Sequence, residues 1–197
     1  MRPNFFVNTP DINPYFLQTS GRPGFQIRLI LAALLGGNYG VYNGFELTEA
    51  TAVRGREDYL DSEKYQIRAW DWDRPGHIRP DIRLVNRLRQ EHPALQEFTN
   101  VRFYNAWDDN ILYFGKATAG RESFILTLVN LDPHVAHDAN FEVPLWEFGL
   151  PDEAGIEVED LVTGIRFTWQ GKIQNIRLDP HYRPYAIFRL IPPGEHE

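Results

Sequence analysis

Two acidic residues follow short apolar segments near the start of the chain. Phe5 to Asn8 reads as a strand with Asp11 just beyond it, and Tyr39 to Tyr42 reads as a strand followed by Glu46. In a (β/α) barrel the carboxyl ends of the strands form the active-site rim, so acids placed there are usually functional. An ionised carboxylate only accepts hydrogen bonds, which suits paired hydroxyl groups. The pattern therefore makes Asp11 and Glu46 candidate functional acids.

Composition narrows the function classes. The chain has 197 residues, of which 43% are hydrophobic and 24% charged, as is usual for a soluble globular protein. Its net charge is −7 and Lys/Arg runs are absent, which argues against a nucleic-acid partner. The chain has no cysteine, and its histidines lack metal-ligand spacing, so we expect neither a metal nor a cofactor.

The chain shows no targeting or membrane segment. No signal-peptide pattern opens it, and its longest apolar run, Leu29 to Leu35, is too short to cross a bilayer. We therefore expect no membrane contact and a cytoplasmic location.

Up to about Leu95, strand and helix patterns alternate. Ser20 is placed to cap a helix that Gly36 and Gly37 stop, and Pro93 ends a second helix. Apolar residues at helical spacing mark the two helices: Phe25, Leu29, Ala32 and Ala33 in the first, and Ile78, Ile82, Val85 and Leu88 in the second. Strand–helix–strand–helix is the unit of a parallel barrel or a doubly wound sheet. A barrel needs eight strands, so this half is incomplete in isolation.

From about Phe98 onward the pattern becomes one of short strands separated by Gly, Pro, Asn and Asp. Eight runs without helical spacing predict an antiparallel sandwich. They are Val101–Tyr104, Ile111–Phe114, Phe124–Asn130, Asn140–Val143, Glu157–Leu161, Phe167–Trp169, Ile173–Leu178 and Tyr185–Leu190. No low-complexity linker separates the halves, so we expect them to pack rigidly together.

Taken together, these segments resemble the end of the glycoside hydrolase family 13 (α-amylase) barrel and the β-sandwich that follows it. Phe6-Val7-Asn8-Thr9-Pro10-Asp11 is similar to the seventh strand of that family, with Thr9-Pro10 where Asn-His is usual. Tyr42-Asn43-Gly44-Phe45-Glu46 resembles the end of the eighth strand. The resemblance implies an α/β part followed by an all-β part. Residues 1–97 would hold the last two β/α units of a TIM (β/α)8 barrel, and residues 98–197 an antiparallel β-sandwich C-terminal domain.

The departure at position 10 favours one branch of the family. Pro10 cannot make the hydrogen bond that the usual histidine makes to a sugar hydroxyl. Asn8 to Pro14, with Asp61-Ser62-Glu63-Lys64-Tyr65 and Arg68-Ala69-Trp70-Asp71, closely resembles the maltosyltransferases, which lengthen α-glucans with maltose 1-phosphate.

The resemblance implies roles for three residues. Asp11 would be the third acid of the family, which grips the hydroxyls of the reacting sugar and stabilises the transition state. Lys64 and Tyr65 would bind substrate on the donor side. The alternatives are that Asp11 caps a turn, that Lys64 is a solvated loop residue and that Tyr65 packs. Glu46 is more often structural in the family, holding the rim by hydrogen bonds.

The function that we expect follows from this resemblance. The chain would be the C-terminal portion of a retaining glycosyltransferase that moves maltosyl units from maltose 1-phosphate to the non-reducing end of α-1,4-glucans. Its nucleophile and acid/base would lie upstream, so the chain alone would be inactive, and the full-length enzyme would be a homodimer. Two alternatives stay open: another α-amylase-family hydrolase or trehalose-forming isomerase, and a non-catalytic carbohydrate-binding β-sandwich module.

Overall fold

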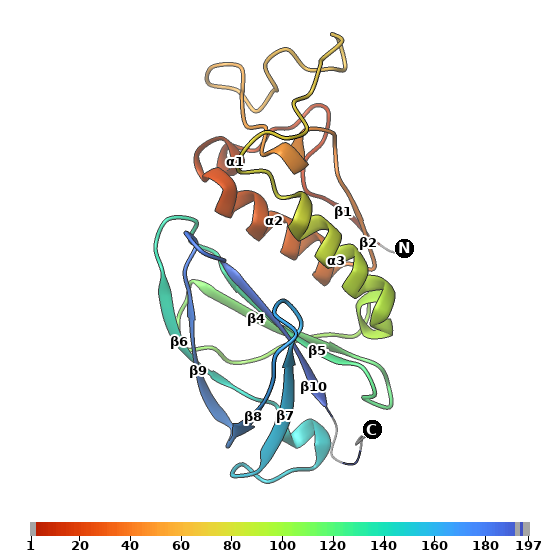
Figure 1. Ribbon diagram of the computed structural model, residues 1–197, viewed down its shortest axis with the longest axis vertical. Coiled ribbons are helices and arrows are strands. Elements are labelled where there is room, and N and C mark those ends of the chain that lie inside the picture. Colours follow the sequence, from red (N-terminus) through yellow and green to blue (C-terminus); the bar gives the residue numbers. More distant parts are fainter. Residues whose placement is uncertain (1–2, 192–193, 195–197) are drawn as a thin grey trace.

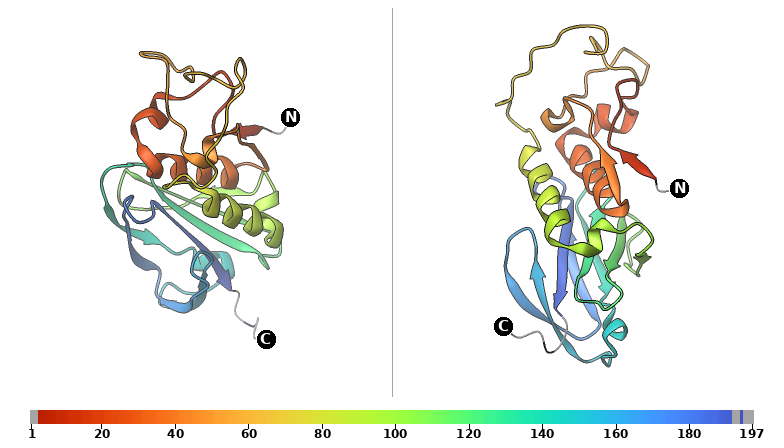
Figure 2. Two further views of the ribbon diagram at one scale, coloured as in Figure 1. Left: turned by 45° about the horizontal axis from the view of Figure 1, so that its top comes forward. Right: turned by 90° about the vertical axis from the view of Figure 1, so that its right-hand side faces the viewer.

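The computed structural model describes residues 3–191 and 194. Its elements form layers along the longest axis of the molecule (Figure 1). A long protruding segment (residues 48–78) lies at one end, two long helices with a small parallel sheet beside them lie in the middle, and antiparallel sheets make up the other end (Figures 1 and 2). No helix among the described residues is long and apolar enough to cross a membrane.

The parallel sheet consists of β1 (Asn4–Phe6) and β2 (Asn38–Gly40). Asn4 pairs with Asn38 and Phe6 with Gly40. The helices α1 (Tyr15–Thr19) and α2 (Gly21–Leu35) connect the two strands. The predicted strand–helix–strand unit with parallel strands is therefore confirmed.

Both strands are shorter than predicted at their carboxyl ends. The Val7 N–H still donates to the Gly40 carbonyl at 3.0 Å, but the Val7 carbonyl accepts a hydrogen bond from the Arg28 side chain instead of from a strand. The Tyr42 N–H, two residues beyond the end of β2, likewise donates to the side-chain Oδ1 of Asn8 at 2.9 Å instead of to a strand carbonyl. Side chains thus replace the backbone ladder where the strands open towards the loops.

The helix α2 begins after Ser20, as predicted, but Ser20 does not cap it. Its hydroxyl makes no capping hydrogen bond and has no hydrogen-bond partner among the described residues. Gly21, with φ of +61°, makes the turn between α1 and α2. The prediction of a Ser20 cap is wrong because a glycine in the left-handed region redirects the chain there.

The second long helix is α3 (Arg79–Glu91), and three single-turn helices flank the main elements: η1 (Phe45–Leu47), η2 (Pro93–Gln96) and η3 (Leu145–Phe148). The helix α3 ends just before Pro93, as its sequence predicts. One face of α3 is apolar and contributes Val85 and Leu88 to the core, while Arg83 and Arg87 are exposed on the other side.

All eight predicted strands of the second half form. A six-stranded antiparallel sheet runs in the order β3-β4-β5-β10-β7-β8, and β6 pairs separately with β9. Their bounds are β3 Val101–Phe103, β4 Ile111–Ala117, β5 Phe124–Asn130, β6 His137–Glu142, β7 Gly155–Asp160, β8 Arg166–Gln170, β9 Ile173–Leu178 and β10 Tyr185–Ile191. The predicted antiparallel sandwich is confirmed.

Two apolar clusters hold these layers together. One lies between the six-stranded sheet and the β6–β9 ribbon, with Phe141 and Trp169 at its centre. The other joins the helices to the opposite face of the sheet, and includes Phe25 and Leu29 of α2 as well as Ile125 of β5. Residues from both halves share this second cluster, so the helices rest directly on the sandwich. The parallel strands and their loops are thereby held on a rigid base.

Candidate functional site

The loops that follow β1 and β2 meet the protruding segment at the outer end of the molecule, and we call this junction the rim (Figure 1). Asn8 joins these parts: its Nδ2 donates to the Tyr59 hydroxyl at 2.7 Å, and its Oδ1 accepts from the Tyr42 N–H. Asn8 is 2% exposed, and burial raises the pKa of Tyr59 to about 12. Tyr59 therefore stays a neutral hydroxyl, and the Asn8 bridge fixes both strand ends against the segment.

Asp11 and Lys64 form an ion pair across this junction. Asp11 lies in a tight turn in which the Thr9 and Ile12 backbones exchange hydrogen bonds of 3.2 Å, so the turn is closed by backbone groups. The Asp11 side chain is 66% exposed and that of Lys64 is 39% exposed. The hydrogen bond to Asp11, and then contact with Tyr65, raise the pKa of Lys64, which keeps its ammonium charged at neutral pH.

Tyr65 stands beside this pair. The Lys64 ammonium lies 5.3 Å from the centroid of the Tyr65 ring, and Tyr65 is 79% exposed. The ring is therefore not packed in a core, and its face is available to a ligand. The structure brings all three residues singled out in the sequence, Asp11, Lys64 and Tyr65, to one exposed place.

Glu63 organises the neighbouring part of the rim. Its carboxylate accepts from the Asn43 Nδ2 at 3.0 and 3.1 Å and from the Trp70 indole N–H at 2.9 Å. The guanidinium of Arg68 lies 4.3 Å from the centroid of the Trp70 ring. This network was not expected from the sequence. The strand-end motif that contains Asn43 and the run that contains Glu63 were both visible there, but nothing in the sequence indicated that they meet.

A buried acid, Glu49, anchors the protruding segment. Glu49 is 5% exposed and pairs with Arg68 at 3.1 Å and with Arg74 at 3.4 Å. Burial alone would raise the pKa of Glu49, but hydrogen bonds from Thr51 and the two arginine charges outweigh it, and the pKa is lowered. Glu49 is therefore ionised at neutral pH, and its two ion pairs tie the returning part of the segment, at Arg68 and Arg74, to the residues that follow η1.

Glu46 has a supporting place in this arrangement. Its carboxylate accepts a hydrogen bond of 3.0 Å from the Gly44 N–H, and its carbonyl accepts one of 2.9 Å from the Ile78 N–H. These contacts shape the turn after β2 and tie it to the start of α3, as expected for a structural acid.

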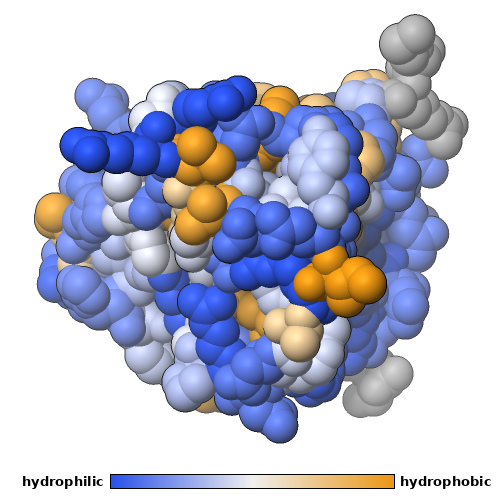
Figure 3. All heavy atoms as spheres, turned by 90° about the horizontal axis from the view of Figure 1, so that it is seen from above, coloured by the Kyte–Doolittle hydropathy of each residue, from blue (hydrophilic) through white to orange (hydrophobic). Residues whose placement is uncertain are grey.

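The arrangement suits a neutral, hydroxyl-rich ligand. The face seen from above is mostly hydrophilic, with isolated apolar side chains between the polar ones (Figure 3). A carboxylate, an ammonium and an exposed aromatic ring are the groups that bind sugar hydroxyls and sugar C–H faces. Within residues 3–191 and 194, His, Asp and Glu form no cluster that could hold a metal ion.

Comparison with known proteins shows which family the chain resembles. Residues 103–190 match the family model described as "GLGE, C-terminal". The chain is 63% identical over 194 residues to the α-1,4-glucan:maltose-1-phosphate maltosyltransferase of Cereibacter sphaeroides, covering 98% of this chain and 29% of that protein. It is 57% identical to the protein of the same name from Pseudomonas aeruginosa, covering 96% of this chain and 28% of that protein. The chain thus spans less than a third of the length of these relatives.

Solved structures show the same fold at low sequence identity. An α-amylase from Anoxybacillus matches 98% of this chain and 39% of its own, with a TM-score of 0.65 and 15% identity. AmyP in complex with maltotriose matches 98% of this chain and 42% of its own, with a TM-score of 0.69 and 14% identity. The solved structures show the fold, and the family model and the relatives confirm the resemblance inferred from the sequence. Residues 103–190 match the C-terminal domain of that family, and almost the whole chain is similar to part of the α-1,4-glucan:maltose-1-phosphate maltosyltransferases.

Proposed function

We propose that the chain is part of a retaining enzyme that moves maltosyl units from maltose 1-phosphate to the non-reducing end of α-1,4-glucans. The name and the high identity of the relatives support this activity. The observation that carries it in this chain is the pairing of Asp11 with Lys64, 53 residues apart, beside the exposed Tyr65.

In this proposal residues 1–97 supply the last two β/α units of a TIM barrel, and residues 98–197 form its C-terminal domain. The parallel pairing of β1 with β2 supports the first part, because it places Asp11 and Asn43 beyond the carboxyl ends of neighbouring strands. That is the end at which barrel enzymes hold their active sites. Further parallel strands would pair with the open edges of β1 and β2.

The chemistry is a double displacement. A carboxylate nucleophile attacks the anomeric carbon of maltose 1-phosphate, the bond to the phosphate oxygen breaks, and inorganic phosphate leaves. The 4-hydroxyl of the glucan then attacks the maltosyl-enzyme while a general base takes its proton, and the carboxylate is released with net retention. Both carboxylates are supplied from outside this chain.

Asp11 acts on the sugar ring during both steps. Lys64 contacts its Oδ1, which leaves Oδ2 for hydroxyls of the reacting sugar. Contacts from a fixed carboxylate that strengthen as the ring flattens lower the barrier more than they tighten substrate binding. The ion pair holds the carboxylate in place for this purpose.

Lys64 and Tyr65 bind the sugar next to the reacting one. The charged ammonium has three donors, of which Asp11 uses one and the Tyr65 side chain another, and the third can reach a ligand hydroxyl. The exposed ring of Tyr65 offers a flat face to a sugar. We further propose that the full-length enzyme works in the cytoplasm as a homodimer.

The decisive assay follows inorganic phosphate and glucan length together in the full-length protein. Phosphate release from maltose 1-phosphate that requires an α-1,4-glucan, with the glucan growing by maltosyl units, is expected. Release of free maltose without growth of the glucan would instead favour a hydrolase.

A further inference from the structure

One turn of the protruding segment lies largely in solvent. The Ser62 carbonyl accepts hydrogen bonds from the Tyr65 N–H at 2.9 Å and from the Gln66 N–H at 3.1 Å, which closes a single turn over residues 62–66. Ser62 is buried, but Tyr65 is exposed, and so is Ile67 just beyond the turn. Because these side chains lie in solvent, apolar packing contributes little to holding the turn. Its position therefore depends on polar anchors.

Two consecutive residues anchor this turn to the two strand-end loops. Lys64 pairs with Asp11, which follows β1. The Glu63 carboxylate accepts hydrogen bonds of 3.0 and 3.1 Å from the Nδ2 of Asn43, which follows β2. Since β1 and β2 pair in parallel, both loops leave the sheet at the same edge. A single peptide joins the two anchors, so the backbone that carries Lys64 and Tyr65 is held from both loops.

Trp70 strengthens the Glu63 anchor. Its indole N–H donates to Glu63 Oε2 at 2.9 Å. The Trp70 ring lies close against the backbone of Gly44, where an added Cβ would come within 2.5 Å of it. The Arg68 guanidinium lies 4.3 Å from the centroid of the same ring and pairs with the buried Glu49 at 3.1 Å. The indole therefore has a fixed position, and its N–H holds the Glu63 carboxylate in one orientation.

These contacts favour a carboxylate at position 63 over other polar side chains. The two groups that reach it, the Asn43 amide and the Trp70 indole, both act as donors there. An ionised carboxylate accepts hydrogen bonds on both oxygens and donates none, so it can serve both partners at once. A glutamine would offer one oxygen instead of two, and its own NH₂ group would face one of the donors.

We propose that Glu63 is a positioning residue that makes the donor site specific for a second sugar. This inference rests on the proposed function, in which Lys64 and Tyr65 bind the sugar next to the reacting one. Glu63 acts through these two residues and does not touch the sugar itself. By fixing the turn, it holds the Lys64 ammonium and the Tyr65 ring where a donor with two sugars meets them and a donor with one sugar does not.

Such a residue should affect the use of the donor and not that of the acceptor. The second sugar is attached on the non-reducing side of the reacting ring, whereas the acceptor attacks its anomeric carbon. Contacts to the second sugar are equal in the ground and transition states, so weakening them raises KM and leaves kcat nearly unchanged. Asp11 should keep its place, because hydrogen bonds between the Thr9 and Ile12 backbones close its turn.

Rates of phosphate release by the full-length protein test the proposal. Glu63→Gln should raise the KM for maltose 1-phosphate about five- to tenfold and change kcat less than about threefold. Its kcat/KM for maltohexaose should stay within about twofold of the wild type, because the maltosyl unit is already attached when the acceptor arrives. Trp70→Phe, which removes the indole N–H, should raise the donor KM by a smaller factor. The effects of the two substitutions should not be additive, because both act through one carboxylate.

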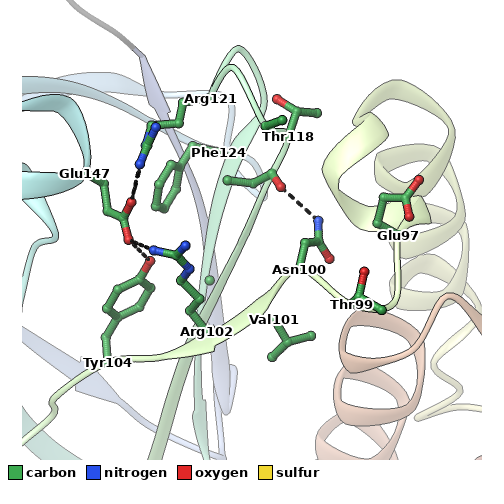
Figure 4. Close-up of a pocket in the computed structure, with 13 residues that line it drawn as sticks. Glu97, Thr99, Asn100, Val101, Arg102, Tyr104, Thr118, Arg121, Phe124 and Glu147 are labelled. Atoms are coloured by element: carbon green, nitrogen blue, oxygen red, sulfur yellow. Dashed lines mark hydrogen bonds and ion pairs between the residues drawn. The ribbon is translucent and has the colours of Figure 1, made fainter.

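Glu147→Gln is the matched control for a general loss of stability. Glu147 lies on η3, at the opposite end of the molecule from the protruding segment (Figure 1). Its carboxylate accepts a hydrogen bond of 2.7 Å from Arg121 Nη2 and pairs with Arg102 (Figure 4). The Glu147 side chain is 6% exposed, so this variant should lower Tm at least as much as Glu63→Gln does. Its KM for maltose 1-phosphate should nevertheless stay within about twofold of the wild type.

Three kinetic outcomes would overturn the role of Glu63. The first is an unchanged donor KM in Glu63→Gln. The second is an equal rise of the donor KM in Glu147→Gln, which would trace the effect to stability. The third is a parallel fall of kcat/KM for maltohexaose, which would mean that the whole site is disturbed.

Calorimetric titration with maltose separates this inference from the proposed function. Maltose should bind Glu63→Gln about five- to tenfold more weakly than the wild type, whether or not the protein turns over maltose 1-phosphate. That result in a protein that releases no phosphate would refute the proposed function and leave the role of Glu63 standing. Equal affinities of the two proteins for maltose, or a wild type that does not bind maltose, would overturn the role of Glu63.

Discussion

Asp81 of α3 accepts a hydrogen bond of 2.8 Å from the hydroxyl of Tyr185 on β10, 104 residues away. The same oxygen accepts from Gln26 of α2 at 2.7 Å, and the other oxygen pairs with Arg22 at 3.1 Å. The Asp81 side chain is 8% exposed. One buried carboxylate thus ties both long helices to the central sheet, and so fixes the layer that carries the rim.

Tyr185→Phe should lower the free energy of unfolding by about 1.5–3 kcal/mol, because the variant leaves a buried charged acceptor short of one donor. Denaturation in urea, followed by circular dichroism, measures the change. Tyr182→Phe is the matched control. Tyr182 and Tyr185 both line a small cavity beside Asp81, but Tyr182 is 76% exposed. It should change stability by less than about 0.5 kcal/mol. Equal effects of the two variants would show that the Asp81 contact contributes nothing.

The secondary structure could largely be read from the sequence because it depends on local patterns. The runs Phe124–Asn130 and Ile173–Leu178 form strands with the predicted bounds. The sequence of helix α3 contains apolar residues at helical spacing and a proline just beyond its end, so both the helix and its end could be predicted. The prediction of a Ser20 cap was wrong because, in the sequence alone, a capping serine cannot be told from a serine that precedes a left-handed glycine. The early end of β1 depends on the side chains of Asn8 and Arg28. They bond the backbone groups of Tyr42 and Val7 that would otherwise continue the strand ladder.

The site was only partly visible for the same reason. Asp11, Lys64 and Tyr65 lie in segments whose family resemblance could be recognised one by one. Their meeting depends on how the protruding segment folds back, which local periodicity does not encode. The pairing of Glu63 with Asn43, 20 residues away, is a long-range polar contact of this kind. The ion pairs of Glu147 with Arg102 and Arg121 are two others. They became apparent only in three dimensions.

Gly44→Ala should damage the rim specifically. Gly44 has φ of +93°, and a Cβ there would lie 2.5 Å from the Trp70 ring, so the ring and its hydrogen bond to Glu63 would have to move. We expect a loss of stability of about 1–3 kcal/mol and a shift in tryptophan fluorescence. Gly55→Ala is the matched control, because Gly55 has φ of +73° and open space around its Cβ position. It should show backbone strain without the spectral change; the same shift in both variants would contradict the Trp70 contact.

Asp11→Asn in the full-length enzyme should lower kcat about 10²-fold or more while KM changes little, because an amide binds hydroxyls but lacks the charge that favours the transition state. Phosphate release from maltose 1-phosphate measures both constants. Asp58→Asn, at a residue whose side chain is 44% exposed and pairs with Arg56, is the same chemical change away from the rim pair and should leave both constants unaltered. An unchanged kcat in Asp11→Asn would remove Asp11 from the mechanism.

Lys116 should give the protein a recognisable pH dependence. It is 1% exposed on β4, its ammonium donates to the Glu97 carbonyl, and burial lowers its pKa from 10.5 to about 8. Below pH 8 both the folded and the unfolded state carry the charge, so the folded state bears the full cost of burying it. Between about pH 8 and pH 10.5 the unfolded state binds the extra proton, so stability contributed at this position rises with pH.

Urea denaturation of the wild type and of Lys116→Met at pH 7 and about pH 9.5 tests this dependence. The difference in free energy of unfolding should move in favour of the wild type at the higher pH, because the buried lysine has then lost its charge. Lys172 is the control: hydrogen bonds to Glu142 and Asp152 raise its pKa, so its contribution is fully present below pH 10.5. The difference between the wild type and Lys172→Met should therefore stay constant over this range. A constant difference for Lys116→Met as well would mean that Lys116 keeps its proton in the folded protein.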